Sequence, residues 1–237
     1  MSWTKWDVGS VDMKARSKRY QREAQQVSKE ALSLDAAVDK IKSFGSVKFD
    51  QTVECVLHLG IDPKQADQLI RGSLSLPHGV GKQKRVIAFC VDSDVEAAKK
   101  AGAVEAGADA LIQKITDGWL DFDVAIASPK VMGKAGKLGR ILGPQGKMPS
   151  PKNGTVTDDV VTAVREFTAG KIEFRNDAGG NVHAVVGKLS FDKKKLVENI
   201  EAFISHIKKI KPSTAKGTYI KKACLSATMS PGVLVSV

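Results

Sequence analysis

The sequence predicts an α/β protein in which both chain ends build one α+β domain, while the middle forms an inserted, three-layer, Rossmann-like α/β domain with a parallel sheet. Segments near both ends alternate apolar and polar residues, which is typical of strands with one face in water. Residues 85–91 and 124–127 are almost continuously apolar, which is typical of strands buried on both faces. Helix-like segments between these two runs indicate the crossovers of a parallel sheet. We therefore expect a first domain of residues 1–78 and 170–237 and an inserted domain of residues 79–169.

The N-terminal part of the first domain shows two helix signals and one strand signal. Residues 13–32 are rich in Lys, Arg, Gln and Ala, so we expect a polar helix that contributes little to the core. Ser33 and Asp35 can cap a second helix over residues 34–44, whose apolar positions recur at helical spacing. The strict alternation over residues 47–59 predicts a half-buried strand.

Proline and glycine punctuate the next part of the chain. Asp62 and Pro63 are typical of a helix start, so a helix is expected from there to about Gly72. Residues 73–76 predict a brief strand that Pro77 ends. The elements expected in the inserted domain are a strand at 85–91, helices at 94–101 and 109–115, and a strand at 124–127.

The C-terminal part returns to half-buried strands around one long amphipathic helix. Asp192 can cap that helix, and Pro212 follows its end. The expected elements are strands at 171–175 and 181–189 joined by a turn at 177–180, the helix at 191–210, and strands at 218–228 and 233–237.

Composition and charge favour a polyanionic partner. Against 26 Asp and Glu, the 237 residues include 37 Lys and Arg, giving a net charge of +11. Nucleic acid is favoured over anionic lipid. The three cysteines form no CxxC motif and no histidine lies at zinc-ligand spacing, so we expect neither a metal site nor a disulfide framework, and a reducing compartment such as the cytoplasm. No segment resembles a signal peptide or a membrane span, so we expect no membrane partner.

Positive charge is concentrated in two stretches. No acidic residue lies between Asp123 and Asp158, and glycines there alternate with cations, so residues 130–154 form either a phosphate-contacting surface or a solvated loop. Residues 216–222 also carry lysines without acids. The candidate contacts for tRNA or phosphate in the first stretch are Lys130, Lys134, Lys137, Arg140, Lys147 and Lys152.

Enzyme motifs are missing from the sequence. There is no phosphate-binding loop, no GxGxxG after a strand and no GxSxG, and the four histidines have no motif partner. We therefore expect no catalytic residues and no cofactor. The alternative is an α/β enzyme that holds a phosphorylated substrate at residues 130–154. Aromatic residues make up only 5% of the chain, which disfavours base stacking on a sheet and favours contacts to the backbone of folded RNA.

An ordered set of long motifs resembles the L1 family of large-subunit ribosomal proteins, in its bacterial form. The likeness covers roughly residues 14–235. The motifs that carry it are residues 48–54, 71–79, 118–123, 137–144, 170–175 and 216–221.

The resemblance implies a function in the ribosome. Family members bind large-subunit rRNA through the first domain, form the mobile stalk that assists release of deacylated tRNA from the exit site, and can repress translation of their own mRNA. The implied partners are large-subunit rRNA, exit-site tRNA and the protein's own mRNA leader, with no homo-oligomer. The rRNA contacts implied by motif are Lys48, Phe49, Thr52, Arg175, Asp177, His183, Lys188, Ser226, Thr228, Met229 and Ser230.

Three features remain to be tested beside this resemblance. Ser230 stands where the family has glycine, so either the turn avoids a positive φ, or Ser230 adopts a strained conformation, or Gly232 takes up the strain. The N-terminal extension, residues 1–13, is either disordered or folds against rRNA. The two chain crossings between the domains, at residues 78–79 and 169–170, are expected to form a hinge.

Overall fold

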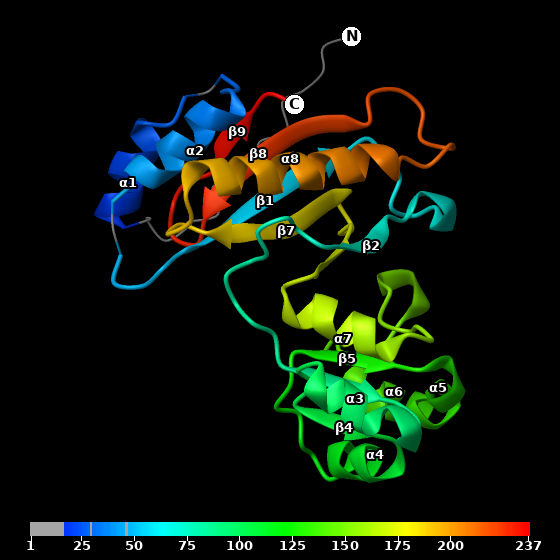
Figure 1. Cartoon of the computed structure of the whole chain (residues 1–237). Coiled ribbons are helices and arrows are strands. Elements are labelled where there is room, and N and C mark those ends of the chain that lie inside the picture. The colour runs from blue at the N-terminus through cyan, green and yellow to red at the C-terminus, as the bar shows by residue number, and fades with distance from the viewer. Residues whose placement is uncertain (1–16, 29, 46) are drawn as a thin grey trace.

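The computed structural model describes residues 17–28, 30–45 and 47–237, and it has two lobes (Figure 1). The described segments before and after the middle of the chain form the upper lobe of Figure 1, and the middle of the chain forms the lower lobe. The extension at residues 1–13 lies outside the described residues, as do the first four positions of the helix expected at 13–32. The mixed α/β class is confirmed, with one antiparallel and one parallel sheet of three or more strands.

The upper lobe is built on a four-stranded antiparallel sheet in the order β7-β1-β8-β9. The central strand β1 comes from the N-terminal part, and both of its neighbours come from the C-terminal part. Distant segments therefore share one sheet. The strands are β1 (Thr52–Leu59), β7 (Asn181–Lys188), β8 (Ile220–Ala227) and β9 (Val233–Val235).

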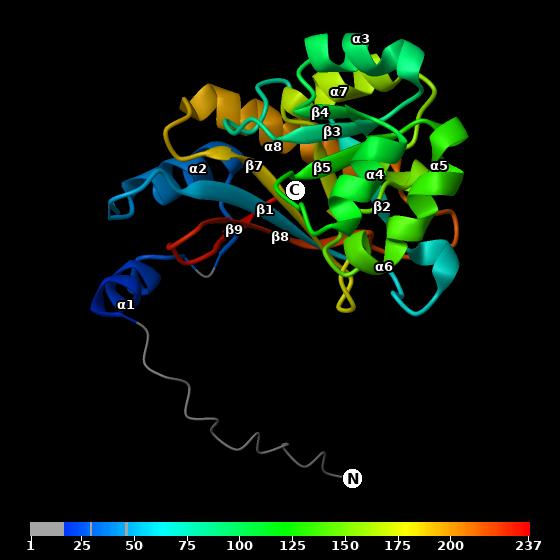
Figure 2. The same cartoon turned by 90° about the horizontal axis from the view of Figure 1, so that it is seen from below.

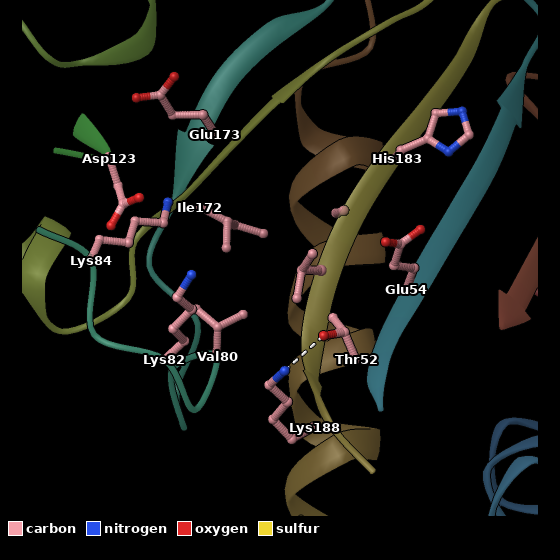
Figure 3. A pocket seen from close by; sticks show the side chains of 12 residues that line it. Thr52, Glu54, Val80, Lys82, Lys84, Asp123, Ile172, Glu173, His183 and Lys188 are labelled. Carbon is pink, nitrogen blue, oxygen red and sulfur yellow. Dashed lines mark hydrogen bonds between the residues drawn. The ribbon is translucent and has the colours of Figure 1, made fainter. Parts of the chain in front are cut away.

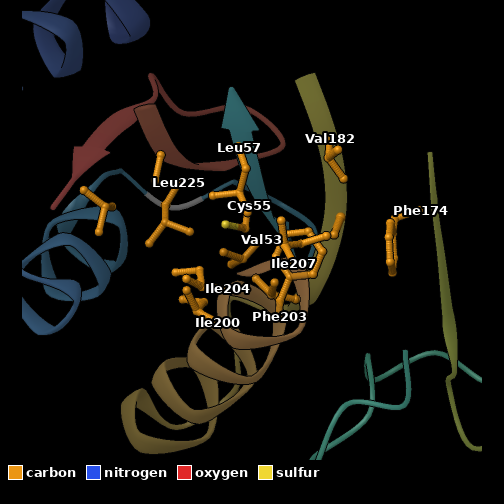
Figure 4. Packing of buried hydrophobic residues seen from close by; sticks show 14 of the residues in the cluster. Val53, Cys55, Leu57, Phe174, Val182, Ile200, Phe203, Ile204, Ile207 and Leu225 are labelled. Atoms are coloured by element: carbon orange, nitrogen blue, oxygen red, sulfur yellow. The ribbon is translucent and has the colours of Figure 1, made fainter. Parts of the chain in front are cut away.

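Two helices, α2 (Leu34–Ser43) and α8 (Lys193–Lys209), cover one face of this sheet. Val53, Cys55 and Leu57, alternate residues of β1, point into the space between the sheet and α8, where Phe203 is fully buried (Figure 4). The helix α1 (Lys18–Gln25) is polar, as expected. None of the described helices covers the opposite face of the sheet, and most of the strand residues that point to it are polar. The residues that fill the core between α8 and the sheet include Val53, Cys55, Leu57, Val182, Ile200, Ile204, Ile207 and Leu225.

A two-stranded ribbon joins the upper lobe to the lower one. Strand β2 (Arg71–Leu74) pairs antiparallel with β6 (Ile172–Arg175), and Phe174 packs edge-on against Phe203 with ring centroids 6.0 Å apart. The helix expected from Asp62 to Gly72 is wrong. Only a single 3-10 turn, η1 (Ala66–Gln68), forms there, because the Gln68 side chain accepts a hydrogen bond from the Asp62 backbone and the chain then enters the ribbon.

The lower lobe is a three-layer unit around a parallel sheet in the order β4-β3-β5. Helices α3 (Val95–Lys100) and α7 (Val160–Thr168) bury one face of this sheet. Helices α4 (Asp109–Thr116), α5 (Pro129–Ala135) and α6 (Gly139–Leu142) bury the other face (Figure 2). The short strand β4 has no counterpart in the sequence prediction, because three residues leave no readable pattern. The remaining elements are β3 (Val86–Phe89), β4 (Glu105–Gly107), β5 (Val124–Ala127), η2 (Asp92–Asp94), η3 (Gly136–Leu138) and η4 (Pro151–Asn153).

The two chain crossings between the lobes run side by side and depend on glycine. Gly79 and Gly170 have φ angles of 62° and 108°, where a side chain is strained. A Cβ on Gly170 would lie 2.9 Å from the Val80 side chain. The fully buried Asn199 of α8 holds the first crossing: its Nδ2 donates to the Gly79 carbonyl at 3.0 Å, and its Oδ1 accepts from the His78 N–H at 3.1 Å.

Candidate nucleic-acid interface

The open face of the four-stranded sheet presents rows of polar side chains. Because side chains alternate along a strand, the residues of β1 that do not enter the core all point to this face. Val56 lies beside His183, and His58 lies between Asn181 and Lys222. The face therefore combines hydrogen-bonding groups with two histidines and a lysine. Its members are Thr52, Glu54, Val56 and His58 on β1, Asn181, His183 and Val185 on β7, and Lys222, Cys224 and Ser226 on β8.

At one end of this face, the start of β1 is hydrogen-bonded to the turn after β8. The Thr52 N–H donates to Thr228 Oγ1 at 3.1 Å, and the Thr228 N–H donates to the Thr52 carbonyl at 3.1 Å. The buried side chain of Gln51 accepts from the Met229 N–H at 3.0 Å. These bonds fix the conformation of the turn. The Met229 side chain on this turn is 47% exposed to solvent. We call this part the corner: residues 48–52, Lys188 and residues 226–230.

The corner also holds an exposed aromatic ring and a lysine. Phe49 is 52% exposed, an unusual state for a phenylalanine in the absence of a partner. The loop that carries it is fixed by Asp50, which accepts hydrogen bonds from the backbone and hydroxyl of Ser190 at 3.1 and 2.7 Å. Lys188 Nζ donates to Thr52 Oγ1 at 2.8 Å (Figure 3). Apolar, hydroxyl and cationic groups thus meet within one small surface.

Ser230 is accommodated without backbone strain. Among the residues that the structure describes, no residue other than glycine has a positive φ. Ser230 Oγ instead accepts a hydrogen bond from the Ala227 N–H at 2.9 Å. The first of the three alternatives for this position is therefore confirmed. Gly232 is needed for another reason, since a Cβ there would lie 2.7 Å from Cys224 Sγ.

The other implied rRNA contacts lie away from the corner. Asp177 shapes the turn before β7: its carboxylate accepts from the Asn181 side chain at 3.0 Å, the Asn181 N–H at 2.7 Å and the Gly179 N–H at 2.8 Å. These bonds, led by the Asn181 side chain, lower the pKa of Asp177 to about 2. His183 Nε2 lies 3.6 Å from the same carboxylate. Arg175 lies at the end of the ribbon. The structure therefore gathers eight of the eleven positions at the corner and separates Arg175, Asp177 and His183 from them. Lys48 is exposed in the loop beside Phe49.

A cleft of about 380 Å³ separates the open face from the lower lobe (Figure 3). Thr52, His183 and Lys188 line its upper wall, and Lys82 and Lys84 line its lower wall. Burial lowers the pKa of the Lys84 ammonium, with nearby carboxylates opposing the shift. Cations therefore border the cleft on both sides, together with the carboxylates of Glu54, Asp123 and Glu173.

The Gly-rich stretch at residues 130–154 is not the loop expected from its sequence. Helices α5, η3, α6 and η4 occupy most of it, so backbone amides there bond within the fold and do not present a phosphate-binding nest. Lys134 pairs with Asp109 at 2.8 Å. Lys147 is half-buried, donating to the Leu120 carbonyl at 3.0 Å. Within the described residues, the cations of this stretch without an ion pair are Lys130, Lys137, Arg140, Lys147 and Lys152.

Sequence reasoning missed three residues of the corner and the open face. The Arg19 guanidinium on α1 donates to the Met229 carbonyl at 3.1 Å, and Gln51 supports the Met229 N–H. Neither contact leaves a sequence signal, because each joins segments far apart in the chain. Glu54 could have been found, since the alternation of β1 places it on the open face.

The described part of the chain holds no group of three or more His, Cys, Asp or Glu side chains arranged to bind a metal ion. In the same residues, none of the helices has the length and apolarity that a membrane crossing requires.

Comparison with known proteins identifies a family. The model of the ribosomal protein L1p/L10e family matches residues 40–231. Proteins named large ribosomal subunit protein uL1 are similar over nearly the whole chain. The protein from Thermobifida fusca is 51% identical over 221 residues, covering 93% of this chain and 94% of its own. Those from Beutenbergia cavernae and Cutibacterium acnes are 50% and 49% identical over 93% of this chain, and 93% and 95% of their own lengths are covered.

Proposed function

The chain belongs to the ribosomal protein L1p/L10e family, and from this premise we propose that it binds large-subunit rRNA through the corner and the adjoining open face of its four-stranded sheet. As a member of the family it is a structural constituent of the large ribosomal subunit and not an enzyme. The alternative of an enzyme for a phosphorylated substrate is therefore set aside.

The observation that carries the proposal is the corner. Two apolar side chains, Phe49 and Met229, are exposed to solvent. They share the corner with the hydroxyls of Thr52 and Thr228 and with the Lys188 ammonium. Folded RNA offers ribose faces, 2′-hydroxyls and phosphates, and these match apolar, hydroxyl and cationic groups respectively. The hydrogen bonds between Thr52 and Thr228, and the one from the Met229 N–H to the Gln51 side chain, hold this set rigid before RNA binds, which lowers the entropic cost of binding.

The two-lobed division supports a mobile stalk. We assign residues 1–78 and 170–237 to an rRNA-binding domain and residues 79–169 to an inserted domain that moves on the two glycine-dependent crossings. The crossings lie side by side, so a rotation about them leaves both cores intact.

Contacts to exit-site tRNA and to the protein's own mRNA extend the proposal. For tRNA, electrostatic attraction comes from Lys130, Lys137 and Arg140 on one part of the inserted domain, which form no ion pair with any residue that the structure describes. For mRNA, the same corner binds a leader that folds like the rRNA site. A translation reaction programmed with that leader, with and without added protein, tests repression.

Filter binding tests the central proposal. We expect a transcript of the stalk rRNA to bind the wild-type chain tightly and in a salt-dependent manner. The Thr228→Val and Met229→Ala variants are expected to bind more weakly. Thr214→Val, an exposed threonine outside the corner and the open face, is the matched control and is expected to bind like the wild type. Failure of the wild-type chain to bind the transcript would refute the proposal.

A further inference from the structure

A pocket with a basic lining lies where the ribbon meets the lower lobe, outside the corner. Its volume is about 310 Å³. Three of its lining residues are cations and none is acidic, although the chain as a whole carries many acids. The lining residues are Leu69, Ile70, Arg71, Lys152, Arg175 and Asn176.

The two arginines stand directly opposite each other on neighbouring strands. Arg71 of β2 is the register partner of Arg175 of β6, and both side chains are exposed. Like charges in this position repel and destabilise a strand pair. Within the described residues, neither arginine nor Lys152 forms an ion pair. In the part of the chain that the structure describes, three cations therefore lie together without a counter-charge, an arrangement that an anion would stabilise.

Lys152 reaches the pocket from the other lobe because η4 is held against the ribbon. Asn153 Nδ2, the next residue, donates to Glu173 Oε2 at 2.9 Å. The following residue, Gly154, turns with a φ of 67° and approaches Ser73 of β2 so closely that a Cβ would lie 3.2 Å from its hydroxyl. The carboxylate nearest in the ribbon is thus engaged by Asn153, and it does not line the pocket.

We propose that this pocket binds one phosphate group of an RNA strand through Arg71, Arg175 and Lys152. A guanidinium offers paired N–H donors that match two phosphate oxygens, and an ammonium adds a point charge. The inference deepens the proposed function and rests on it, since it adds a phosphate contact at the junction of the lobes to the contacts at the corner.

The pocket would couple RNA binding to the arrangement of the lobes. The three cationic residues come from both sides of the junction: Arg71 and Arg175 lie on the ribbon, and Lys152 lies on η4. A phosphate can therefore contact all three only while η4 lies against the ribbon. A ligand that binds one arrangement better than another shifts the population toward it. RNA held here therefore favours the juxtaposed lobes.

The test uses the full-length chain and four proteins: wild type, Arg71→Gln, Lys152→Gln and Lys99→Gln. Lys99 is an exposed lysine of α3 outside the pocket and serves as the charge-matched control. Affinity for the stalk rRNA transcript is measured over a range of KCl concentrations. We expect Arg71→Gln and Lys152→Gln each to weaken binding roughly tenfold and to lower the log–log salt slope by about 0.7 to 0.9. Lys99→Gln should change neither quantity.

Two further measurements separate the outcomes. Removing Arg71 relieves its repulsion with Arg175, so the melting temperature of Arg71→Gln should not fall. If the melting temperature does fall, the RNA affinity of Lys152→Gln decides the test, because the Lys152 side chain lies outside the ribbon and its loss does not disturb the strand pairing. In a second arm, inorganic phosphate is titrated at fixed ionic strength while backbone amide signals of the ribbon are followed by NMR.

The result that overturns the inference is wild-type affinity and salt slope in both pocket variants. Phosphate-induced NMR shifts together with unchanged RNA affinity also overturn it, because the pocket would then hold a free anion and not the strand. Loss of binding in the pocket variants supports it. Failure of the wild-type chain itself to bind would instead overturn the proposed function.

Discussion

Replacing Asn199 by leucine should loosen the first crossing between the lobes. The buried amide makes three hydrogen bonds: its Nδ2 donates to the Gly79 and Val186 carbonyls at 3.0 and 2.8 Å, and its Oδ1 accepts from the His78 N–H. Leucine has a similar size but no hydrogen-bonding group, so three backbone groups lose their partner. At about 1 to 1.5 kcal/mol for each bond, the free energy of unfolding should fall by about 3 to 4.5 kcal/mol.

Urea denaturation followed by circular dichroism measures this loss, and limited proteolysis reports on residues 77–81. We expect Asn199→Leu to be cleaved there faster than the wild type, because the crossing no longer has its anchor. Asn153→Ala is the matched control. It removes one half-buried bond, to Glu173, and should cost about 1 kcal/mol or less. A loss below about 1 kcal/mol in Asn199→Leu would show that other contacts hold the crossing.

Three other predictions concern the corner, the second crossing and the turn before β7. Thr228→Val and Met229→Ala should each weaken binding of stalk rRNA by about 1 to 3 kcal/mol in a filter-binding assay; the melting temperature should stay unchanged in Met229→Ala and fall slightly in Thr228→Val, because the Thr52 N–H loses its acceptor, and an unchanged affinity in both variants contradicts the role of the corner. Gly170→Ala should destabilise the protein by about 1 to 3 kcal/mol in thermal unfolding, because its φ of 108° and its tight surroundings do not admit a methyl group; a neutral effect would mean that the crossing relaxes freely. Hydrogen bonds hold the pKa of Asp177 at about 2, below its ordinary value of 3.8, so the carboxylate stabilises the fold fully above about pH 4 and this stabilisation is lost as the pH falls through 2. Asp177→Asn should therefore reduce the acid dependence of the unfolding free energy between pH 5 and pH 2, and an identical pH profile would contradict this assignment.

Buried strands and long amphipathic helices could be predicted well from the sequence. The strand expected at residues 124–127 coincides with β5, because a continuous apolar run is stable as a strand only where both of its faces are buried. The helix expected at 191–210 is α8 with its ends shortened, although Asp192 makes no capping hydrogen bond through its side chain. The strand expected at 47–59 begins only at Thr52, because its first residues form the loop that exposes Phe49.

Errors arose where tertiary contacts override local preference. Asp62 and Pro63 are typical of a helix start, yet the chain bends through η1 and becomes a ribbon strand opposite β6, a partner about a hundred residues later. Glycines at residues 133–143 indicate a loop, but they lie in or next to helical turns. Among them, Gly143 is the one in tight surroundings, since a Cβ there would lie 2.4 Å from the Gly139 carbonyl. Neither outcome has a local signal.

The types of residue in the candidate site could be predicted from the sequence, but the contacts that bring these residues together could be predicted only in part. Alternation along β1 and β8 shows which side chains face away from the core, and this identifies Thr52 and Ser226 as surface groups. The pairing of Thr52 with Thr228 joins positions 176 residues apart, and the support from Arg19 and Gln51 is equally remote. Such contacts depend on the packed fold, which single-sequence patterns do not specify.

The placement of β1 between two C-terminal strands sets an order for folding during synthesis. Translation proceeds from the N-terminus, so β1 leaves the ribosome long before β7 and β8 exist to pair with it. The parallel sheet of the middle segment, whose strands are close in sequence, can assemble in the meantime. An exposed, unpaired β1 is a site for wrong strand pairing until then. A chain that stops short of β8 would therefore carry a finished inserted lobe beside an aggregation-prone strand.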